Sequence, residues 1–387
     1  MNGNPPIPAN VARASQFKPK ELHGPVPRVS VLVPARNEED NLARCLRSLV
    51  TQQGIAFEII VIDDHSVDGT RAIAQQFAAR SDGGTGDAAC GSLVRVVVIE
   101  ARSPLPEGWT GKANALWTGA RLARGDWLLF TDADTEHAAG SLASVVREAE
   151  ERGVGLLSLS PEQEVEGFCE RALMPVVFSE LAATYKPGEV SDPAKPAAAA
   201  NGQYMLIRRA VYDEVGGHEA VACDLLEDVA LARRVKGAGH MLVFRMGKGT
   251  VRTRMYRGWG QMREGWTKNL VLLFPEARRL AGRRMGEFVA LTALPLAATA
   301  LGKGARVPAL LTAGFFWARF IARVRRAHFD PLSTALSVFG LPLFAALLLR
   351  SECAHRSGRV PWKGRNYCAP EASRKKGPVP FQHAEHD

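Results

Sequence analysis

Two aspartates, Asp132 and Asp134, stand one residue apart immediately after an apolar stretch at residues 127–131. On a turn, this spacing directs both carboxylates to one side, and hard cations such as Mg²⁺ or Mn²⁺ prefer oxygen ligands of this kind. A cation held there could also bind the phosphates of a nucleotide. We therefore interpret the pair as a candidate metal site, with a solvated structural turn as the alternative.

Two further acidic pairs could bind a ligand or accept a proton. Asp63 and Asp64 follow the apolar run 57–62, and Glu227 and Asp228 open a predicted helix. A carboxylate can remove the proton of an acceptor hydroxyl as a new bond forms. The alternative for the second pair is an ordinary helix start, where the helix dipole favours acidic residues.

One lysine, Lys112, begins a predicted helix within the sequence Gly-Lys-Ala-Asn and could neutralise a phosphate group. It does not belong to a Walker A motif, because Pro106 occupies the position of the first glycine and Ala113 replaces the required Ser or Thr. An exposed lysine at a helix start is the alternative.

Apolar, β-branched runs alternate with helical patterns and indicate how these side chains are positioned. The predicted strands span residues 29–33, 57–62, 94–99 and 127–131. The predicted helices span residues 68–79 and 112–123, and another follows a cap at Asn37. Residues 81–92, rich in Gly and Asp, are predicted to form a surface loop. This order predicts an α/β fold with a parallel sheet and helices on both faces. In such sheets ligands bind beyond the carboxyl ends of the strands, where the acidic motifs fall.

The positive charge of the chain is concentrated in one block. The 387 residues carry 49 Lys and Arg against 40 Asp and Glu, yet residues 233–286 alone hold 14 basic and two acidic residues. A composition of 46% hydrophobic and 23% charged residues excludes a disordered or collagen-like chain. The basic block fits an anionic membrane surface or substrate phosphates, with a solvated basic face as the alternative. No recognised nucleic-acid motif accompanies it, so nucleic acid is not an expected partner.

Three uncharged apolar stretches follow this block, at residues 288–302, 307–318 and 332–349. Spanning a bilayer core takes about 20 helical residues, and each stretch is near or below that length. Arginine clusters flank the first two, which fits membrane-associated helices with an arginine-rich cytoplasmic side. A buried helical core is the alternative. Two spans plus an interfacial helix would keep the basic C-terminal tail on the cytoplasmic side, whereas three spans would not.

The sequence from Val29 to about Leu270 resembles the family 2 glycosyltransferases, which have the GT-A fold. The segments that carry the resemblance are VSVLVPARNEEDNLARCLRSL, IVIDDHSVDGT, GWTGKANALWTGARLARGDWLLFTDADT, NGQYMLIRRAVYDEVGGH and LLEDVALARRVKGAGH. The GWTGK segment together with C-terminal apolar helices resembles, more narrowly, bacterial enzymes of hopanoid and carotenoid pathways. The resemblance implies a Rossmann-like nucleotide-diphospho-sugar transferase domain with C-terminal apolar, membrane-associated helices.

The resemblance also implies roles for the candidate residues. Asp228 would be the general base, with Glu227 orienting it or contacting the acceptor. Asp134 would bind the metal, and Asp132 would contact the metal or the ribose. The residues expected to bind the nucleotide sugar are Pro34, Arg36, Glu38, Asp63, Asp64, Lys112 and Asp132.

Processive members of the family usually carry a Gln-x-x-Arg-Trp element that grips the growing chain. Here Arg263 and Trp266 are three residues apart instead of adjacent, so a single transfer is expected and polymer synthesis is not. Arg263, Trp259 and Trp266 are candidate acceptor contacts, and docking of their helix on a membrane is the alternative for the two tryptophans. Residues 166–185 are expected to form an acceptor lip, an interfacial helix, or an amphipathic helix on the core.

Together with these observations, the resemblance implies an inverting, metal-dependent glycosyltransferase of the hexosyltransferase type. It would move a sugar from a nucleotide-diphosphate donor, expected to be UDP-linked, to a lipid or lipid-linked acceptor at the cytoplasmic face of the cell inner membrane. A soluble acceptor is one alternative, and a catalytically inactive membrane-anchored protein that binds nucleotide sugar is another. A nucleotidyltransferase fits less well, because the PARNEEDN segment lacks a glycine-rich loop for a triphosphate.

The expected domain organisation has four parts. A flexible proline-rich tail covers residues 1–27, the GT-A domain covers 28–285, membrane-associated helices cover 286–350, and a polar basic tail covers 351–387. All catalytic motifs are therefore expected upstream of the apolar helices.

Overall fold

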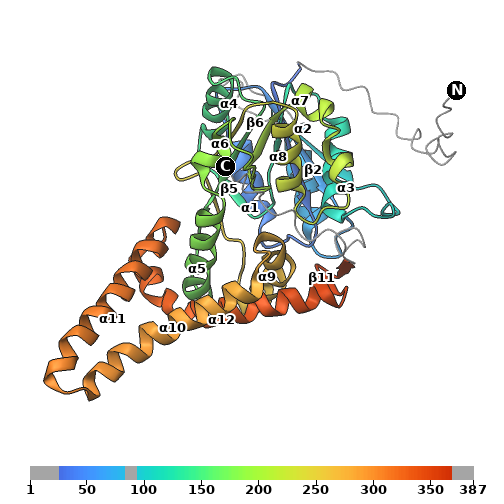
Figure 1. The fold of residues 1–387 in the computed structure, drawn as a ribbon. Helices are drawn as coiled ribbons and strands as arrows, with labels where there is room; N and C mark the ends of the chain where they lie inside the picture. The colour runs from blue at the N-terminus through green and yellow to red at the C-terminus, as the bar shows by residue number, and fades with distance from the viewer. Residues whose placement is uncertain (1–25, 83–93, 368–387) are drawn as a thin grey trace, which may run out of the picture.

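The computed structural model describes residues 26–82 and 94–367. The predicted N-terminal tail thus lies almost entirely outside the described residues, as do most of the predicted loop at 81–92 and the chain after residue 367. The described part consists of an α/β domain, a group of long helices and a small C-terminal hairpin (Figure 1).

A seven-stranded sheet forms the centre of the described α/β domain. In spatial order its strands are β3 (Arg95–Glu100), β2 (Phe57–Asp63), β1 (Val29–Ala35), β4 (Trp127–Phe130), β8 (Met205–Arg208), β6 (Leu156–Ser160) and β9 (Leu242–Met246). The sheet is parallel except at β8, which runs antiparallel to both of its neighbours, β4 and β6. The predicted parallel order fails there because the chain re-enters the sheet at Met205, opposite Phe130 at the carboxyl end of β4.

Helices cover both faces of this sheet, as predicted. The helices of the α/β domain are α1 (Leu42–Val50), α2 (Thr70–Asp82), α3 (Gly111–Leu122), α4 (Ser141–Glu151), α6 (Pro187–Ser191), α7 (Arg209–Glu214), the 3₁₀ turn η3 (Gly217–Val221) and α8 (Glu227–Gly237). Val31 of β1 packs in one apolar cluster with α1, α2 and α4, whereas its neighbour Leu32 packs in a second with α3, α7 and α8. Because side chains alternate along a strand, β1 holds both layers together.

The predicted strands and helices of residues 28–131 appear close to their expected bounds. One detail is wrong: Asn37 does not cap the first helix, which begins at Leu42. Asn37 instead has a positive φ of 52°, and its Oδ1 accepts a hydrogen bond from the Val67 N–H at 3.0 Å. A small second sheet follows the strand ends and consists of β5 (Thr135–His137), β10 (Val251–Thr253) and β7 (Glu162–Gln163).

The long helices form a third apolar cluster beneath the α/β domain (Figure 1). They are α5 (Phe168–Thr184), α9 (Trp259–Leu273), α10 (Ala277–Ala300), α11 (Lys303–Val324), the turn η4 (Arg325–Ala327) and α12 (Pro331–Arg356). Helices α10 and α11 extend outward as an arm, and α12 runs beneath the domain past α5 and α9. The segment expected at 166–185 is therefore a helix that packs on this layer. The expected domain boundaries at 285 and 350 fall inside α10 and α12.

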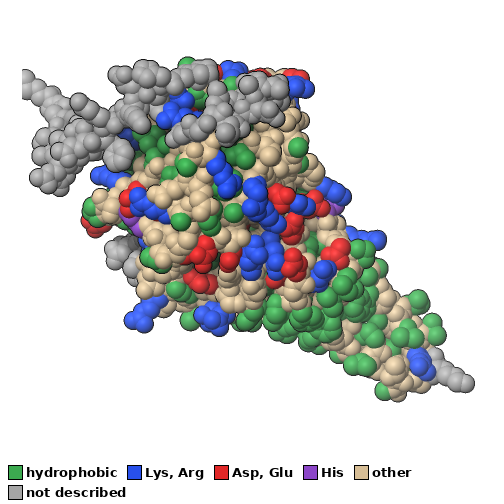
Figure 2. Space-filling model, turned by 180° about the vertical axis from the view of Figure 1, so that it is seen from behind, with side chains coloured by type: hydrophobic (Ala, Val, Ile, Leu, Met, Phe, Trp, Pro, Cys, Tyr) green, Lys and Arg blue, Asp and Glu red, His purple; other side chains and the backbone are tan. Residues whose placement is uncertain are grey.

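Two helices in the described part are long and apolar enough to cross a membrane, Gly304–Ala327 and Pro331–Arg356. Only 17% of the apolar window of the first is buried inside the protein, against 56% for the second. The arm is thus mostly exposed, whereas α12 is half covered by other helices. Figure 2 shows the arm as largely hydrophobic, with basic and acidic side chains gathered where it joins the domain.

Two features fix the packing of the long helices. Glu180 of α5 and Glu287 of α10 accept from Arg284 at 2.9 Å each, and both also pair with Arg323 of α11. Helices α5 and α12 cross so closely at Gly340 that a Cβ there would overlap the backbone oxygen of Ala172. Only glycine allows this approach, so the crossing is specified by one residue.

The chain after α12 does not lead away as a simple tail. It forms an antiparallel hairpin of β11 (Val360–Trp362) and β12 (Arg365–Tyr367). The two turn residues, Lys363 and Gly364, have φ values of 45° and 75°. Positive φ at both positions is the mark of a type I′ turn, whose twist suits a two-residue hairpin.

Candidate active site

The carboxyl ends of β1 and β2 meet at one edge of the sheet, because the strands are parallel neighbours. Arg36, just after β1, donates from Nη1 to the backbone oxygen of Asp64 at 2.6 Å, and the Asp64 N–H donates to Ala35 at 2.8 Å. Asp63 and Asp64 are both buried, and Asp63 Oδ1 accepts from the backbone N–H of Ser66 at 3.1 Å. The predicted residues of these two strands, with Pro34 inside β1, thus lie together.

Lys112 connects the strand-end acids with the acids of α8. Helix α3 begins beside it because the hydroxyl of Thr110 accepts from the Ala113 N–H at 3.1 Å. The Lys112 Nζ lies 2.8 Å from Asp132 Oδ1 and 3.0 Å from Glu227 Oε1. Burial would lower the pKa of Lys112, but the negative charges of Asp132 and Glu227 outweigh it and raise that pKa well above its usual value. Lys112 is therefore a fixed cation between two acids.

Asp228 lies in the first turn of α8 and is held by backbone donors. Its Oδ2 accepts from the Gly202 N–H at 2.7 Å, and its Oδ1 accepts from the Val229 N–H at 2.8 Å. Burial, and then the charge of Glu227, raise the pKa of Asp228 to about 6. A carboxylate whose pKa approaches the working pH is suited to general base catalysis.

Glu227 differs from its neighbour although both are acids in the same turn. Burial alone would raise the pKa of Glu227, but the positive charges of Lys112 and Lys268 outweigh burial and lower it. The environment therefore separates the pair into a more acidic anchor, Glu227, and a more basic carboxylate, Asp228. Such separation is how paired acids acquire different roles.

Asp134 has the surroundings of a cation ligand. Burial, and then the charges of Asp132 and Glu38, raise the pKa of Asp134 to about 7. An amide, Gln203 Nε2, donates to both carboxylate oxygens of Asp134 at 3.4 Å. A divalent cation would relieve this repulsion, so Asp134 and Asp132 fit the predicted metal site. No group of three His, Cys, Asp or Glu that could hold a metal occurs within residues 26–82 and 94–367, so a cation would need further ligands from phosphate or water.

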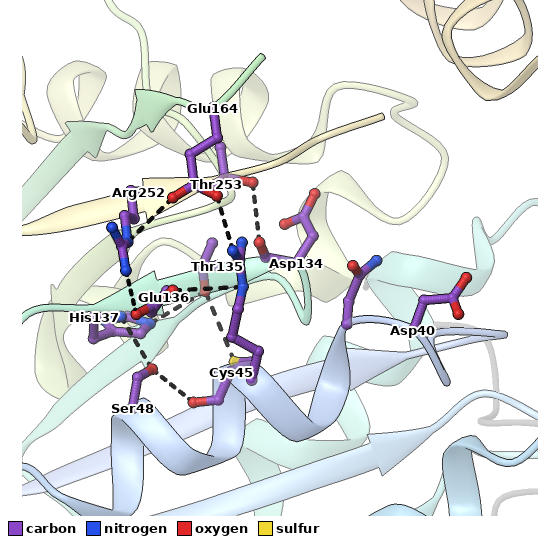
Figure 3. Close-up of polar contacts among 12 residues, drawn as sticks. Asp40, Cys45, Ser48, Asp134, Thr135, Glu136, His137, Glu164, Arg252 and Thr253 are labelled. Carbon is purple, nitrogen blue, oxygen red and sulfur yellow. Dashed lines mark hydrogen bonds and ion pairs between the residues drawn. The ribbon is translucent and has the colours of Figure 1, made fainter. Parts of the chain in front are cut away.

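The turn that carries Asp132 and Asp134 rests on an uncharged network that sequence reasoning did not identify (Figure 3). Thr135 Oγ1 donates to the backbone oxygen of Asp132 at 2.8 Å, and Cys45 Sγ of α1 lies 3.8 Å from the same oxygen. Burial raises the pKa of Cys45 to about 12 and lowers the pKa of His137 to about 4, so both are neutral. In Figure 3 the Asp134 side chain points away from this support.

Three basic residues that sequence reasoning did not single out also surround the acids. Lys268 comes from α9, and its Nζ lies 5.4 Å from the centre of the Trp362 ring. Burial lowers the pKa of Lys268, although Glu227 opposes the shift. Lys363 pairs with Glu38, and Arg365 binds both carboxylate oxygens of Asp64, with Nη2 at 3.0 Å from Oδ1. The available sequence signal was Trp-Lys-Gly-Arg, in which glycine takes the second position of a two-residue turn that requires positive φ.

The predicted acceptor residues are spread along α9. Trp266 is buried and meets the rings of Phe178 and Tyr256 edge-on, at centroid distances of 6.4 and 5.8 Å. This placement favours packing of α9 on α5. Trp259 is 37% exposed and Arg263 is exposed, so both remain available for an acceptor or a membrane surface.

Known proteins with similar sequence and structure were found for most of the chain. Residues 30–216 match the family described as Glycosyl transferase family 2. The 4,4'-diaponeurosporenoate glycosyltransferase of Staphylococcus haemolyticus (strain JCSC1435) is 30% identical over 252 residues, 63% of this chain and 61% of that protein. The protein of the same name from Staphylococcus aureus (strain MRSA252) is 26% identical over 376 residues, 92% of each chain. A mannosyltransferase from Pyrobaculum calidifontis, solved with GDP-Man and Mn²⁺, is 19% identical with a TM-score of 0.50, over 85% of this chain and 86% of that one.

Proposed function

We propose that this chain, whose residues 30–216 match the family described as Glycosyl transferase family 2, transfers a sugar from a nucleotide-diphosphate donor to a lipid or lipid-linked acceptor. One observation carries the proposal. Lys112 bridges Asp132 of the Asp-x-Asp turn and Glu227, which adjoins Asp228, the carboxylate with the raised pKa. One lysine therefore connects the candidate donor site with the candidate base for the acceptor.

The donor side consists of the strand-end acids. Asp64, with Asp63, would receive the nucleotide base, and a uracil base is expected. Asp132 and Asp134 would hold Mg²⁺ or Mn²⁺, which neutralises phosphate charge when bound. Lys112 supplies positive charge at the start of α3, where a helix also favours anions.

The acceptor side uses Asp228 as the general base. The acceptor hydroxyl oxygen forms a bond to the anomeric carbon while the bond from that carbon to the diphosphate breaks, and the hydroxyl proton passes to the Asp228 carboxylate. A single displacement of this kind inverts the anomeric configuration. With a pKa of about 6, Asp228 is largely ionised at neutral pH and can accept the proton.

The lipid acceptor is supported by the arm and by the curated relatives. Val289, Leu296, Val307, Leu311 and Phe315 on α10 and α11 are all more than half exposed. Apolar surface on this scale suits a bilayer or its interface. The name of the two staphylococcal relatives gives diaponeurosporenoate as their substrate, so we propose an apolar acceptor here too. The catalytic domain would then lie on the cytoplasmic face of the inner membrane, against the basic block of residues 233–286.

A donor screen tests the proposal. Purified full-length protein is incubated with Mn²⁺, a radiolabelled nucleotide sugar and a native lipid extract, and the label is followed into the organic phase. We expect transfer from one donor, an inverted linkage by NMR, and loss of transfer in Asp228→Asn but not in Asp224→Asn, a nearby exposed carboxylate. Label in water-soluble products alone would show a soluble acceptor, and binding of a nucleotide sugar without any transfer would indicate an inactive module.

A further inference from the structure

The C-terminal hairpin, residues 360–367, reaches the donor site from the far end of the chain. Arg365 binds both oxygens of the Asp64 carboxylate, although the two residues are 301 positions apart. Asp64 is buried, and it is the acid proposed to receive the nucleotide base. The hairpin therefore contacts the donor site directly and not merely its rim.

The tip of the hairpin is anchored by several bonds around Lys363. Its Nζ pairs with Glu38 and donates to the backbone oxygen of Arg36 at 3.0 Å. Arg36 Nε donates in return to the backbone oxygen of Lys363 at 3.1 Å, and the Lys363 N–H donates to Glu264 of α9 at 2.9 Å. The hairpin is thus held between the end of β1 and α9.

Arg365 also lies against the first residue of α3. A Cβ on Gly111 would overlap the Arg365 guanidinium and would come within 2.7 Å of Asp64 Oδ2. Gly111 is the first residue of α3, so the guanidinium stands at a helix N-terminus. The next residue is Lys112, whose Nζ pairs with Asp132 and Glu227. Helix N-termini and adjacent cations bind phosphate groups well, which makes this a suitable place for the donor's diphosphate.

We propose that Lys363 and Arg365 are donor-binding residues that exchange partners when the donor enters. The nucleotide base needs Asp64, both oxygens of which are taken by Arg365, so Arg365 must leave them. The released guanidinium and the Lys363 ammonium then bind the diphosphate at the start of α3. Arginine can bind phosphate in the same two-pronged way as it binds a carboxylate, so little pairing energy is lost in the exchange. This inference rests on the proposed function, in which Asp64 receives the base.

A pure plug is the competing interpretation of the same contacts. In that case the hairpin only blocks Asp64 and makes no bond to the donor. The two interpretations predict opposite effects of removing the Arg365 charge. Loss of a donor-binding residue weakens nucleotide binding, whereas loss of a plug strengthens it.

The test is calorimetric binding of UDP and GDP, with Mn²⁺, to the full-length protein in detergent. We expect Arg365→Ala to weaken binding of the preferred diphosphate by roughly ten- to hundredfold. Lys363→Ala should weaken binding less. The affinity of Arg365→Lys should lie between that of Arg365→Ala and that of the unmodified protein. The monophosphates UMP and GMP should be affected less than the diphosphates. Arg359→Ala, which removes an exposed arginine just before the same hairpin, is the matched control and should bind normally.

Each other result contradicts the inference. Tighter binding by Arg365→Ala would show a plug, and unchanged binding by Arg365→Ala and Lys363→Ala would show that neither residue contacts the donor. The melting temperature of each variant establishes that it is folded. If the unmodified protein binds no nucleotide at all, the proposed function fails as well, and that result is distinct from a failure confined to the variants.

Discussion

Replacement of Lys112 by methionine would test how strongly one cation organises the acidic site. Methionine keeps a similar length and removes the charge. The change leaves Asp132 and Glu227 without a cation that now lies within 3.0 Å of both. Because the Glu227 side chain is only 6% exposed, water cannot replace the lost partner well. The variant should therefore be less stable at neutral pH.

The size of the effect follows from distance and exposure. Two unit charges 3 Å apart attract by about 5 kcal/mol at an effective dielectric constant of 20, which is an upper bound. Removing one partner of a buried pair costs about 3–5 kcal/mol. The Lys112 side chain is 31% exposed and that of Asp132 is 28% exposed, so solvent screening lowers our expectation to about 2 kcal/mol. For a chain of 387 residues, whose unfolding entropy is on the order of 0.8 kcal/mol/K, this corresponds to a fall in melting temperature of about 2–3 °C.

Thermal unfolding in detergent at pH 7.5 and pH 4 is the assay. The pKa of Glu227 is lowered in the folded state, so its stabilising effect is present above the ordinary carboxyl pKa and is lost as the pH falls through the folded value. The difference between Lys112→Met and the unmodified protein should therefore shrink in acid. Lys186→Met is the matched control, because Lys186 pairs with Glu189 at 2.7 Å but both are at least half exposed. Equal losses in the two variants, or a difference that grows in acid, would refute the reasoning.

Three further predictions concern the base, the metal and the helix layer. Asp228→Asn should lower kcat by roughly 10²–10⁴-fold. The kcat/KM of the unmodified enzyme should decrease at pH values under about 6, because protonated Asp228 cannot accept a proton. A flat pH profile between pH 5 and 8 would contradict this role. Asp134→Ala should abolish turnover while circular dichroism stays unchanged, and full activity in EDTA would contradict metal dependence. Gly340→Ala should lower the melting temperature, because the new Cβ meets the Ala172 backbone oxygen, whereas Gly304→Ala has open space and should not; equal melting temperatures would disprove the close crossing.

The sheet and most of the acidic site could be predicted because their signals are local. Each strand of residues 28–131 is an apolar run, and each acidic motif directly follows such a run or opens a helix. Parallel neighbours then bring Asp64 and Asp132 to the same edge by geometry alone. The antiparallel direction of β8 was not predictable in this way, because it depends on where the chain re-enters the sheet.

The cations of the site were harder to predict because they come from distant elements. Lys268 reaches the acids only through the packing of α9, and Arg365 only through the course of α12 beneath the domain. Composition identified residues 351–387 as a basic tail, but composition cannot show where such charges bind. Similarly, Trp266 looked like an acceptor contact by sequence position, whereas its ring packs among the aromatic side chains of the helix layer.

The contacts of the C-terminal hairpin, β11 and β12, with the ends of β1 and β2 also impose an order during synthesis. Glu38 and Asp64 leave the ribosome early, whereas Lys363 and Arg365 emerge after α10, α11 and α12 have all been made. A nascent or prematurely terminated chain that ends after α9 would carry every acid of the site but lack two of its counter-charges. The site is therefore completed only after the apolar helices have been synthesised, so a nascent chain that lacks the arm cannot carry the full set of counter-charges.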